Sequence, residues 1–448
     1  MWNEIFYKGA INMLLTTVSS PTEITASGQD WANHIAGYYT SDIQLKVILE
    51  FESRIDVELM QKAIRQSIDA EPILGCRFVE DPQNAYWKRY EDINQLTWCL
   101  FEEKQNKDEA IHTFLSNPIE PQEQLLHARI IRSQESDTLC LVINHACSDA
   151  AGAKDYIHLL ASIYSHLVQD KDYTQAQNLS THRDASKVYQ ALGIDDIRTA
   201  WNPQRIASKP TWAFPNYPGN KESLQIAMRK LDATAFSSLY SYSKINGKTI
   251  NDLMLTAFYR AMFEMVSPPN EEPMELTATV DLRKYLPTKK AETICNLSGA
   301  INTRVARYSG EDFESTLARV SEAMNILKND NPGIHNAAGM EIMRGMRYQD
   351  VEMFLRNAKQ KGHESGKSSP LFSNMGIIAD YPLKFGNVAI NDLYIVSPAA
   401  FTPGLIFAFG TYNKAITITI SYYEPLNRKK DVEHFLDLFI KELEVCMN

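Results

Sequence analysis

The stretch from Thr138 to Val168 constrains the fold more than any other part of the chain. It begins with an unbroken run of apolar strand formers, Leu139 to Ile143, which is typical of a strand buried on both faces of a sheet. From about Ala150 the apolar residues recur at steps of three and four, as on one face of a helix. The segment between them, His145 to Asp149, is therefore expected at the carboxyl edge of a sheet, where α/β proteins tend to place their chemistry.

His145 and Asp149 admit two interpretations from this stretch alone. A hydrogen-bonded, inert histidine at a strand end is as well supported as a functional one, because intermediate burial is normal for histidine. Neutral imidazole is, however, the usual general base for a hydroxyl, an amine or a thiol near pH 7. An aspartate, with an unperturbed pKa of about 3.9, is better suited to fix the turn than to take the proton.

Length and charge narrow the classes of protein that this chain can be. At 448 residues it is long for a single hydrophobic core, so we expect two domains. Its 45 basic and 55 acidic residues give a net charge of −10, and the sequence contains no basic stripe of the kind that binds nucleic acid. No apolar run approaches the roughly 18 residues that a membrane span requires, so we expect no span.

The N-terminal segment and the cysteines indicate a cytoplasmic protein. Acidic and aromatic residues, including Trp2, Phe6 and Tyr7, stand where a signal peptide has a basic region and then a long apolar one. We expect this aromatic segment, together with Trp31, to pack on a larger body. The six cysteines are scattered without a C-x-x-C pair, which fits reduced thiols and predicts neither a disulfide framework nor a zinc site.

The pattern of the whole chain predicts two α/β halves, each a mixed sheet flanked by helices. We place the N-terminal half at residues 1–175, a crossover linker at 176–222 and the C-terminal half at 223–448. Strands are expected at 43–51, 72–78, 85–90, 127–133 and 139–143, then at 224–231, 275–287, 296–305, 371–379, 388–396, 405–412 and 416–423. Helices are expected after Asp56 and Lys248 and at 311–327, 336–359 and 432–446, and the composition of 359–369 predicts a mobile loop.

Three stretches resemble motifs of the chloramphenicol acetyltransferase-like superfamily, which includes condensation domains and alcohol acetyltransferases. Asn144-His-Ala-Cys-Ser-Asp149 resembles its HxxxD signature, and Thr279-Val-Asp-Leu-Arg283 resembles the strand whose arginine pairs with the aspartate of that signature. Phe372-Ser-Asn-Met-Gly376 is similar to the strand that faces the histidine from the other half. Pro72 to Phe78 also resembles an early strand of these families.

The resemblance implies two similar halves with a tunnel between them, and it assigns roles to residues of this sequence. His145 would deprotonate the acceptor, Asp149 would orient the loop by pairing with Arg283, and Ser373 and Asn374 would stabilise the oxyanion or position the substrate. The donor would be an acyl thioester of coenzyme A or of a phosphopantetheinyl carrier protein. Nothing in this chemistry requires a metal or a permanently bound cofactor.

Two positions depart from the superfamily pattern. Asn144 stands where condensation domains usually have a second histidine, and Ala150 stands where a glycine usually follows the aspartate. A glycine would allow a positive φ that alanine resists. We therefore expect either a local difference in the turn or an impaired activity.

We therefore predict an acyltransferase that moves an acyl group from a thioester to an alcohol or an amine on a small-molecule acceptor. The alternatives are a stand-alone condensation-type enzyme that forms amides, and a non-catalytic binding protein of the same fold. Cys147 is a weaker candidate nucleophile, because a histidine two residues away in a loop rarely converges on it. Basic residues between Arg344 and Lys367 either form a solvated helix face or meet a coenzyme A phosphate or an acidic carrier protein.

Overall fold

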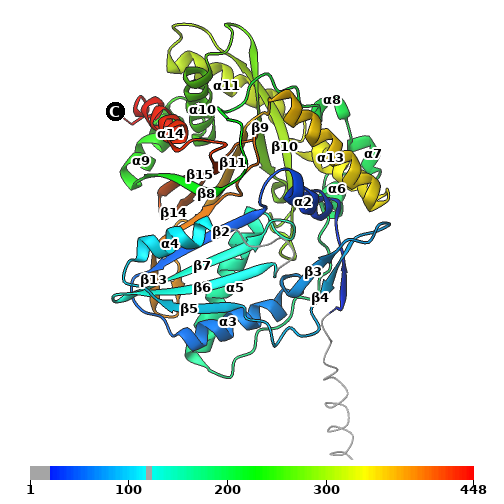
Figure 1. Ribbon diagram of the computed structural model, residues 1–448, viewed down its shortest axis with the longest axis vertical. Coiled ribbons are helices and arrows are strands. Elements are labelled where there is room, and N and C mark those ends of the chain that lie inside the picture. The colour runs from blue at the N-terminus through cyan, green and yellow to red at the C-terminus, as the bar shows by residue number, and fades with distance from the viewer. Residues whose placement is uncertain (1–20, 118–123, 448) are drawn as a thin grey trace, which may run out of the picture.

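Two six-stranded sheets, each covered by helices, form the main body of the protein, and a three-stranded sheet lies beside them. The computed structural model describes residues 21–117 and 124–447; Trp2, Phe6 and Tyr7, whose packing the sequence predicted, lie outside these ranges. Figure 1 shows one large sheet above the other, with α3 (Val57–Ala70) and α5 (Ala150–Gln169) on the lower sheet and α10 (Ile250–Val266) and α14 (Lys429–Glu444) on the upper one. This architecture confirms the predicted fold class.

The first sheet has the strand order β12-β13-β2-β7-β6-β5 and is antiparallel except between β5 and β6. Its strands are β2 (Gln44–Phe51), β5 (Cys99–Glu103), β6 (Leu126–Ser133), β7 (Ser136–Asn144), β12 (Lys384–Phe385) and β13 (Val388–Val396). Leu139, Leu141 and Ile143 of β7 pack with α3 and α5, whereas Cys140 and Val142 pack with α4 (Lys107–Ser116) on the opposite face. Helices on both faces explain why the apolar run of β7 does not alternate with polar residues.

Two strands of the first sheet come from the C-terminal part of the chain. β13 pairs with β2, with Leu393 opposite Leu49 and Ile395 opposite Val47, so it covers an edge of β2 that would otherwise expose unpaired backbone groups. The sequence placed 388–396 within the half that begins at residue 223, because the residues of a strand do not state which sheet it joins. The proposed boundaries at residues 175 and 222 stay a prediction.

The second sheet has the order β10-β9-β11-β14-β15-β8, and only β11 runs parallel to its neighbours. Its strands are β8 (Ser223–Leu231), β9 (Pro273–Asp281), β10 (Ser298–Ala306), β11 (Leu371–Ala379), β14 (Ile406–Tyr412) and β15 (Ala415–Glu424). Helices α10, α11 (Phe313–Lys328) and α14 share its core, and α9 (Ala233–Ile245) precedes α10. Helix α10, which was expected after Lys248, begins with a capping box: the Thr249 side chain accepts from the Asp252 N–H, and the Asp252 side chain accepts from the Thr249 N–H.

The three-stranded sheet corrects one expectation about the first half. Its order is β1-β4-β3, with β1 (Glu23–Thr25), β3 (Cys76–Val79) and β4 (Tyr86–Arg89). The strands predicted at 72–78 and 85–90 therefore do not join the sheet of Leu139, and the first of them begins as a 3₁₀ turn, η1 (Pro72–Gly75). Because Pro72 has no N–H to donate to a ladder, its position before the strand is the favourable one.

The remaining helices differ from the predictions in detail. They are α2 (Gly28–Tyr39), α6 (Ser186–Ala191), α7 (Ile197–Ala200), α8 (Pro203–Ile206), α12 (Ile334–Arg344) and α13 (Tyr348–Ser365), with a 3₁₀ turn η2 (Leu282–Tyr285) after β9. The predicted loop at 359–369 is wrong as far as Ser365, because Lys, Gln and Glu are good helix formers and Gly366, at φ 62°, ends the helix. The sequence also missed α2, whose Trp31 is buried as expected.

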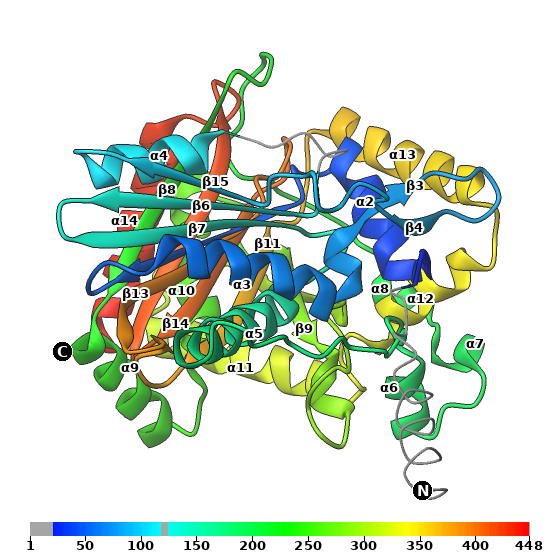
Figure 2. The same ribbon diagram turned by 90° about the horizontal axis from the view of Figure 1, so that it is seen from below.

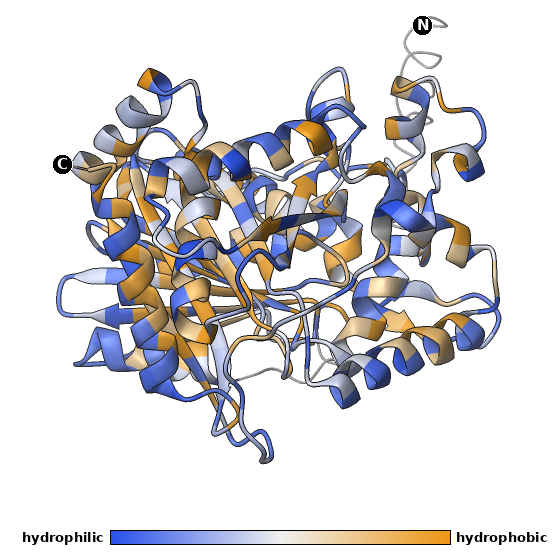
Figure 3. Cartoon of the chain, turned by 90° about the horizontal axis from the view of Figure 1, so that it is seen from above, coloured by the Kyte–Doolittle hydropathy of each residue, from blue (hydrophilic) through white to orange (hydrophobic). Residues whose placement is uncertain are grey.

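Helices α2, α12 and α13 lie together at one end of the first sheet (Figure 2), and this arrangement matters for the site. Apolar residues are concentrated where helices meet sheets, and hydrophilic residues cover the outward helical surfaces (Figure 3). Among the helices of the described ranges, none combines the length and the apolar character needed to span a bilayer.

Candidate active site

A cavity of about 220 Å³ lies between the two large sheets, at the carboxyl end of β7. The first half lines it with residues of α2, β2, the turn after β7 and the start of α5. The second half lines it with residues of β9, β10, β11 and β14. The lining residues include His145, Asp149, Lys154, Thr279, Asp281, Ser298, Ser373, Asn374 and Ile406. The structure thus brings four of the predicted site residues, His145, Asp149, Ser373 and Asn374, to one cavity.

The backbone of His145 is fixed on both sides, and its imidazole faces a desolvated environment. Its N–H donates to the carbonyl of Ile43 at 2.7 Å, and its own carbonyl accepts from Asn296 Nδ2 at 3.0 Å. The Nδ1 atom is buried and has no hydrogen-bond partner within the described ranges. Burial lowers the pKa of His145 from its ordinary value, so the imidazole is neutral near pH 7 and able to accept a proton.

Asp149 forms the ion pair with Arg283 that the sequence predicted. Arg283 Nη1 donates to Asp149 Oδ2 at 2.8 Å, and both side chains are almost fully buried. The carboxylate also accepts hydrogen bonds from the N–H groups of Gly152 at 2.9 Å and Leu297 at 2.8 Å. The first bond caps α5, and the second connects Asp149 to the second half of the chain. No hydrogen bond joins Asp149 to His145 among the described residues, which excludes a triad arrangement of these two side chains in this structure.

The charge of Asp149 is stabilised in spite of its burial. Burial by itself would raise the pKa of this carboxyl, but the Arg283 guanidinium and the backbone N–H donors outweigh that effect and hold the pKa below its usual value. Burial would lower the pKa of Arg283, but the Asp149 carboxylate outweighs it and raises that pKa above its usual value. Asp149 is therefore a stabilised anion that holds the turn.

The two departures from the superfamily pattern are accommodated by the turn. Asn144 Oδ1 accepts the N–H of Ala146 at 2.9 Å, so this side chain braces the turn and does not line the cavity. Ala150 begins α5 with no positive φ, so a glycine is not needed there. The glycine that packing requires is Gly152, because a Cβ on it would overlap Ser148 Oγ and press against the carbonyl of Cys295.

Ser373 and Asn374 lie on β11 and differ in how their polar groups are used. The Asn374 amide is occupied, since its Nδ2 donates to Asn251 at 3.1 Å and its Oδ1 accepts the Gly376 N–H at 2.8 Å. Ser373 lines the cavity, and its Oγ accepts from Thr279 Oγ1 at 3.4 Å. Of the two, Ser373 is the better candidate donor to an oxyanion.

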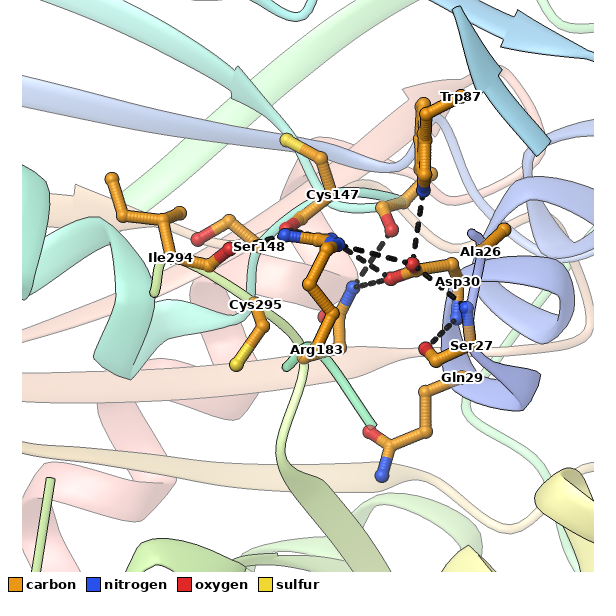
Figure 4. A network of polar contacts seen from close by, with 12 residues as sticks. Ala26, Ser27, Gln29, Asp30, Trp87, Cys147, Ser148, Arg183, Ile294 and Cys295 are labelled. Atoms are coloured by element: carbon orange, nitrogen blue, oxygen red, sulfur yellow. Dashed lines mark hydrogen bonds and ion pairs between the residues drawn. The ribbon is translucent and has the colours of Figure 1, made fainter. Parts of the chain in front are cut away.

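A buried polar network that the sequence analysis missed lies behind the turn of His145 (Figure 4). It consists of Asp30 of α2, Arg183 of the linker and Asn296 before β10, all of them nearly inaccessible to solvent. Asp30 and Arg183 are separated by 153 positions, and no local pattern links them. A signal was present in the Ser27–Asp30 capping pair, which marks the start of α2.

Lys154 is a second residue that sequence reasoning did not select. It lies on the first turns of α5 and lines the cavity, and its Nζ donates to the carbonyl of Met375 at 2.8 Å across the boundary between the halves. Burial lowers the pKa of this ammonium. Lys154 thereby fixes the strand that carries Ser373 relative to the helix that follows His145.

A basic groove of about 910 Å³ opens beside the cavity. Lys221, Arg356, Lys359 and Lys367 line it together with Tyr38, Tyr39 and Phe401, and its described lining includes no carboxylate. The groove and the cavity share a wall in which Phe401 donates its N–H to the Thr40 carbonyl at 2.7 Å. Three cations of the cluster noted in the sequence, Arg356, Lys359 and Lys367, line this groove, whereas Arg344, Arg347 and Lys361 do not.

The cysteines and the acidic groups do not form alternative centres. Cys147 Sγ donates to the Asn144 carbonyl at 3.1 Å, and burial raises the pKa of this thiol to about 12, so it is protonated and poorly nucleophilic. All six cysteines are unpaired and buried. Over residues 21–117 and 124–447, no group of three or more His, Cys, Asp and Glu side chains is arranged to hold a metal ion.

Comparison with known proteins now places this geometry in a family. A family model described as "Condensation domain" matches residues 31–267, more than half of the chain, including the turn of His145. The chain belongs to the condensation-domain family. This membership agrees with the superfamily that the motifs of the sequence resemble.

Solved structures share the fold at low sequence identity. The first condensation domain of the CDA synthetase superposes with a TM-score of 0.69 at 14% identity, covering 96% of this chain and 97% of that one. TRI3 trichothecene 15-O-acetyltransferase from Fusarium sporotrichioides gives 0.69 at 12% identity, covering 97% of each chain. Polyketide synthase associated protein 5 from Mycobacterium tuberculosis gives 0.66 at 14% identity, covering 94% of this chain and 99% of that one. No curated protein sequence matches the chain. At these identities the likeness establishes the fold and leaves the substrates open.

Proposed function

We propose that this protein is an acyltransferase that moves an acyl group from a thioester to an alcohol or an amine, with His145 as the general base. The observation that carries the proposal is the placement of a neutral, desolvated imidazole on the wall of a cavity lined by both halves. A general base of this kind typically contributes about 10²–10⁴ in rate. The family and the fold, which includes both condensation domains and an O-acetyltransferase, are consistent with acyl transfer.

The steps of the reaction assign one task to each side chain. The imidazole of His145 takes the proton of the acceptor O–H or N–H while the acceptor atom attacks the thioester carbonyl. The Ser373 O–H donates to the oxygen that becomes negatively charged in the tetrahedral intermediate. When the C–S bond breaks, the imidazolium returns its proton to the leaving thiolate, so the ester or amide forms and His145 is regenerated. Asp149 and Arg283 stay charged throughout and hold the turn.

The basic groove supports a donor that bears phosphate. Coenzyme A and a phosphopantetheinyl carrier protein both present a phosphorylated pantetheine arm, and neither is held permanently. Lys221, Lys359 and Lys367 offer ammonium groups to such a phosphate without competition from a lining carboxylate. We place the protein in the cytoplasm, where both kinds of donor occur.

An amide-forming, condensation-type enzyme that depends on carrier-bound substrates is the second candidate, and the family match itself favours it. Asn144, in place of the second histidine, favours the acyltransferase. Dependence on a carrier protein, with no turnover of coenzyme A thioesters, would select the second candidate.

The test is a screen for thiol release from acetyl-, hexanoyl- and octanoyl-coenzyme A, with and without added alcohols and amines. We expect acceptor-dependent release that His145→Ala abolishes. The matched control is His158→Ala, because His158 lies on α5, contacts the Ile378 carbonyl at 3.2 Å and is not among the residues that line the cavity. If His145→Ala retains the rate of the unmodified protein on an active donor, the general-base assignment is wrong. If neither coenzyme A nor carrier thioesters react, the protein is a binding protein of this fold.

A further inference from the structure

The buried network behind the turn holds three successive carbonyl groups of that turn. Asn296 Nδ2 donates to the carbonyl of His145 at 3.0 Å and to that of Ala146 at 2.8 Å. Arg183 Nη2 donates to the next carbonyl, that of Cys147, at 2.9 Å. Buried carbonyls need donors, and here the donors are two side chains that the turn itself does not supply.

Asp30 aligns both of these donors. Its Oδ1 accepts from Arg183 Nη2 at 3.1 Å and from Asn296 Nδ2 at 3.5 Å, and its Oδ2 accepts from Arg183 Nε at 3.4 Å. The Trp87 indole N–H, at 2.9 Å, and the Ser27 N–H, at 3.1 Å, complete the shell of this carboxylate. Figure 4 shows Arg183 between Asp30 and the Cys147–Ile294 side of the network. Asp30 thus receives donors from both halves of the chain and from the linker.

The network leaves the imidazole of His145 few ways to move. The His145 N–H is held by the Ile43 carbonyl and its C=O by Asn296, so the φ and ψ angles on both sides of its Cα are fixed. Only rotation about the side-chain bonds remains. Buried arginine–carboxylate pairs hold this turn at two points: Arg183, paired with Asp30, holds the Cys147 carbonyl in its middle, and Arg283 holds Asp149 at its far end.

Stability alone is a poor reason to bury this second pair. Asp30 is 0% exposed and Arg183 is 3% exposed, and a buried ion pair is often no more stable than an apolar packing of the same volume. What the charged pair does supply is direction, because the fork of a guanidinium fixes the angle as well as the distance of each contact. The direction it fixes here is that of the carbonyls next to the proposed base.

We propose that Asn296 and Arg183, aligned by Asp30, are positioning residues for His145. They hold the carbonyl side of the turn so that the imidazole meets the acceptor in the cavity at a reactive distance. This inference rests on the proposed role of His145 as general base, and none of the three residues touches the reacting atoms.

The test uses the full chain and the variants Asn296→Ala, Arg183→Lys and Asp30→Asn. Arg183→Lys is the variant designed to fold, since lysine keeps the buried positive charge. It cannot replace all the contacts of Arg183, whose guanidinium donates to Asp30 and to the carbonyls of Cys147 and Ile294. Thiol release from an active acyl-coenzyme A should show kcat reduced about 10- to 100-fold with KM little changed, because small misplacements of a catalytic group have effects of this size. Combining each variant with His145→Ala should cause no further loss.

The matched control is Arg304→Met, which removes the arginine partner of the buried Glu275 in the second sheet, away from the turn. It should lower the melting temperature and leave kcat unchanged. A second readout is independent of turnover: the NMR titration of the His145 imidazole, identified by its absence in His145→Ala, should shift in Asn296→Ala and Arg183→Lys but not in the control. Folded variants with unchanged kcat and an unchanged imidazole titration would overturn the inference. If His145→Ala is fully active, the proposed function fails, and the titration still decides whether the network positions the ring.

Discussion

The two halves of the molecule contribute to the cavity in different ways. The first half supplies His145 and Asp149 within five residues of one strand–turn–helix unit. The second half supplies Arg283, Asn296 and Ser373, which come from three separate places between β9 and β11. The proposed base is therefore local in the sequence, whereas its support and its oxyanion donor are assembled by the tertiary structure. Replacing His145 or Ser373 should act on the reaction, whereas replacing the residues that support the turn should act on its geometry or on the stability of the fold.

The largest effect is expected from His145→Ala in the first half. Turnover should fall by about 10²–10⁴, because the acceptor loses its general base. Stability should change little, since the ring lines a cavity and its Nδ1 makes no hydrogen bond. Steady-state kinetics and a melting curve on the same preparation measure both. A large drop in melting temperature would break the comparison, because it would make His145 a structural residue.

The next effect concerns Asp149, the residue through which the halves are joined. Asp149→Ala removes the carboxylate from a buried Arg283 and should destabilise the fold by about 3–5 kcal/mol. Asp149→Asn should cost less, because asparagine is an equally good N-cap for α5 and loses only the charge. Denaturant unfolding of the two variants gives the difference. Equal stability of Asp149→Ala and the unmodified protein would show that Asp281, whose Oδ1 already accepts from Arg283 Nη1 at 3.2 Å, suffices as the partner of Arg283.

A smaller effect is expected in the second half, and it should differ between two adjacent residues. Ser373→Ala should lower kcat by about 10²–10³, which corresponds to roughly 3–4 kcal/mol, because it removes the hydroxyl that we propose as the donor to the oxyanion. Asn374→Ala should act mainly through the strand, since both ends of that amide are already hydrogen-bonded to protein. The kinetics of both variants with one donor decide the matter. Equal losses would mean that the amide turns into the cavity during the reaction.

The smallest effect is the dependence on pH. Burial lowers the pKa of His145, so the imidazole should stay in its base form at neutral pH. We therefore expect kcat/KM to decline only well below about pH 6.5. The unfolded chain binds the proton at a higher pH than the folded chain does, so this residue contributes stability above about pH 6.5 that is lost as the pH falls toward its folded value. A pH profile of kcat/KM, with melting curves of the protein and of His145→Ala, checks both. An acid limb above pH 6.5 would contradict the desolvated base.

Local chemistry made much of the fold predictable. The change of period after β7 located the strand, the turn and α5, and the helices expected after Asp56 and Lys248 are α3 and α10, whose N-caps are Asp56 and Thr249. The pairing of Asp149 with Arg283 was predicted through the resemblance of two motifs, and the structure confirms the contact. The roles of His145, Ser373 and Asn374 stay predictions, although the hydrogen bonds of the last two distinguish them.

The amino-acid sequence by itself determined the elements and the chemistry of the turn, because periodicity, caps and residue type act over a few positions. Only the tertiary structure decided that β13 joins the first sheet and that Arg183 meets Asp30 behind His145. Contacts between residues this far apart depend on which surfaces pack together. The sequence around a buried arginine does not identify the distant carboxylate that pairs with it. The residues that hold the proposed base could therefore be identified only from the tertiary structure.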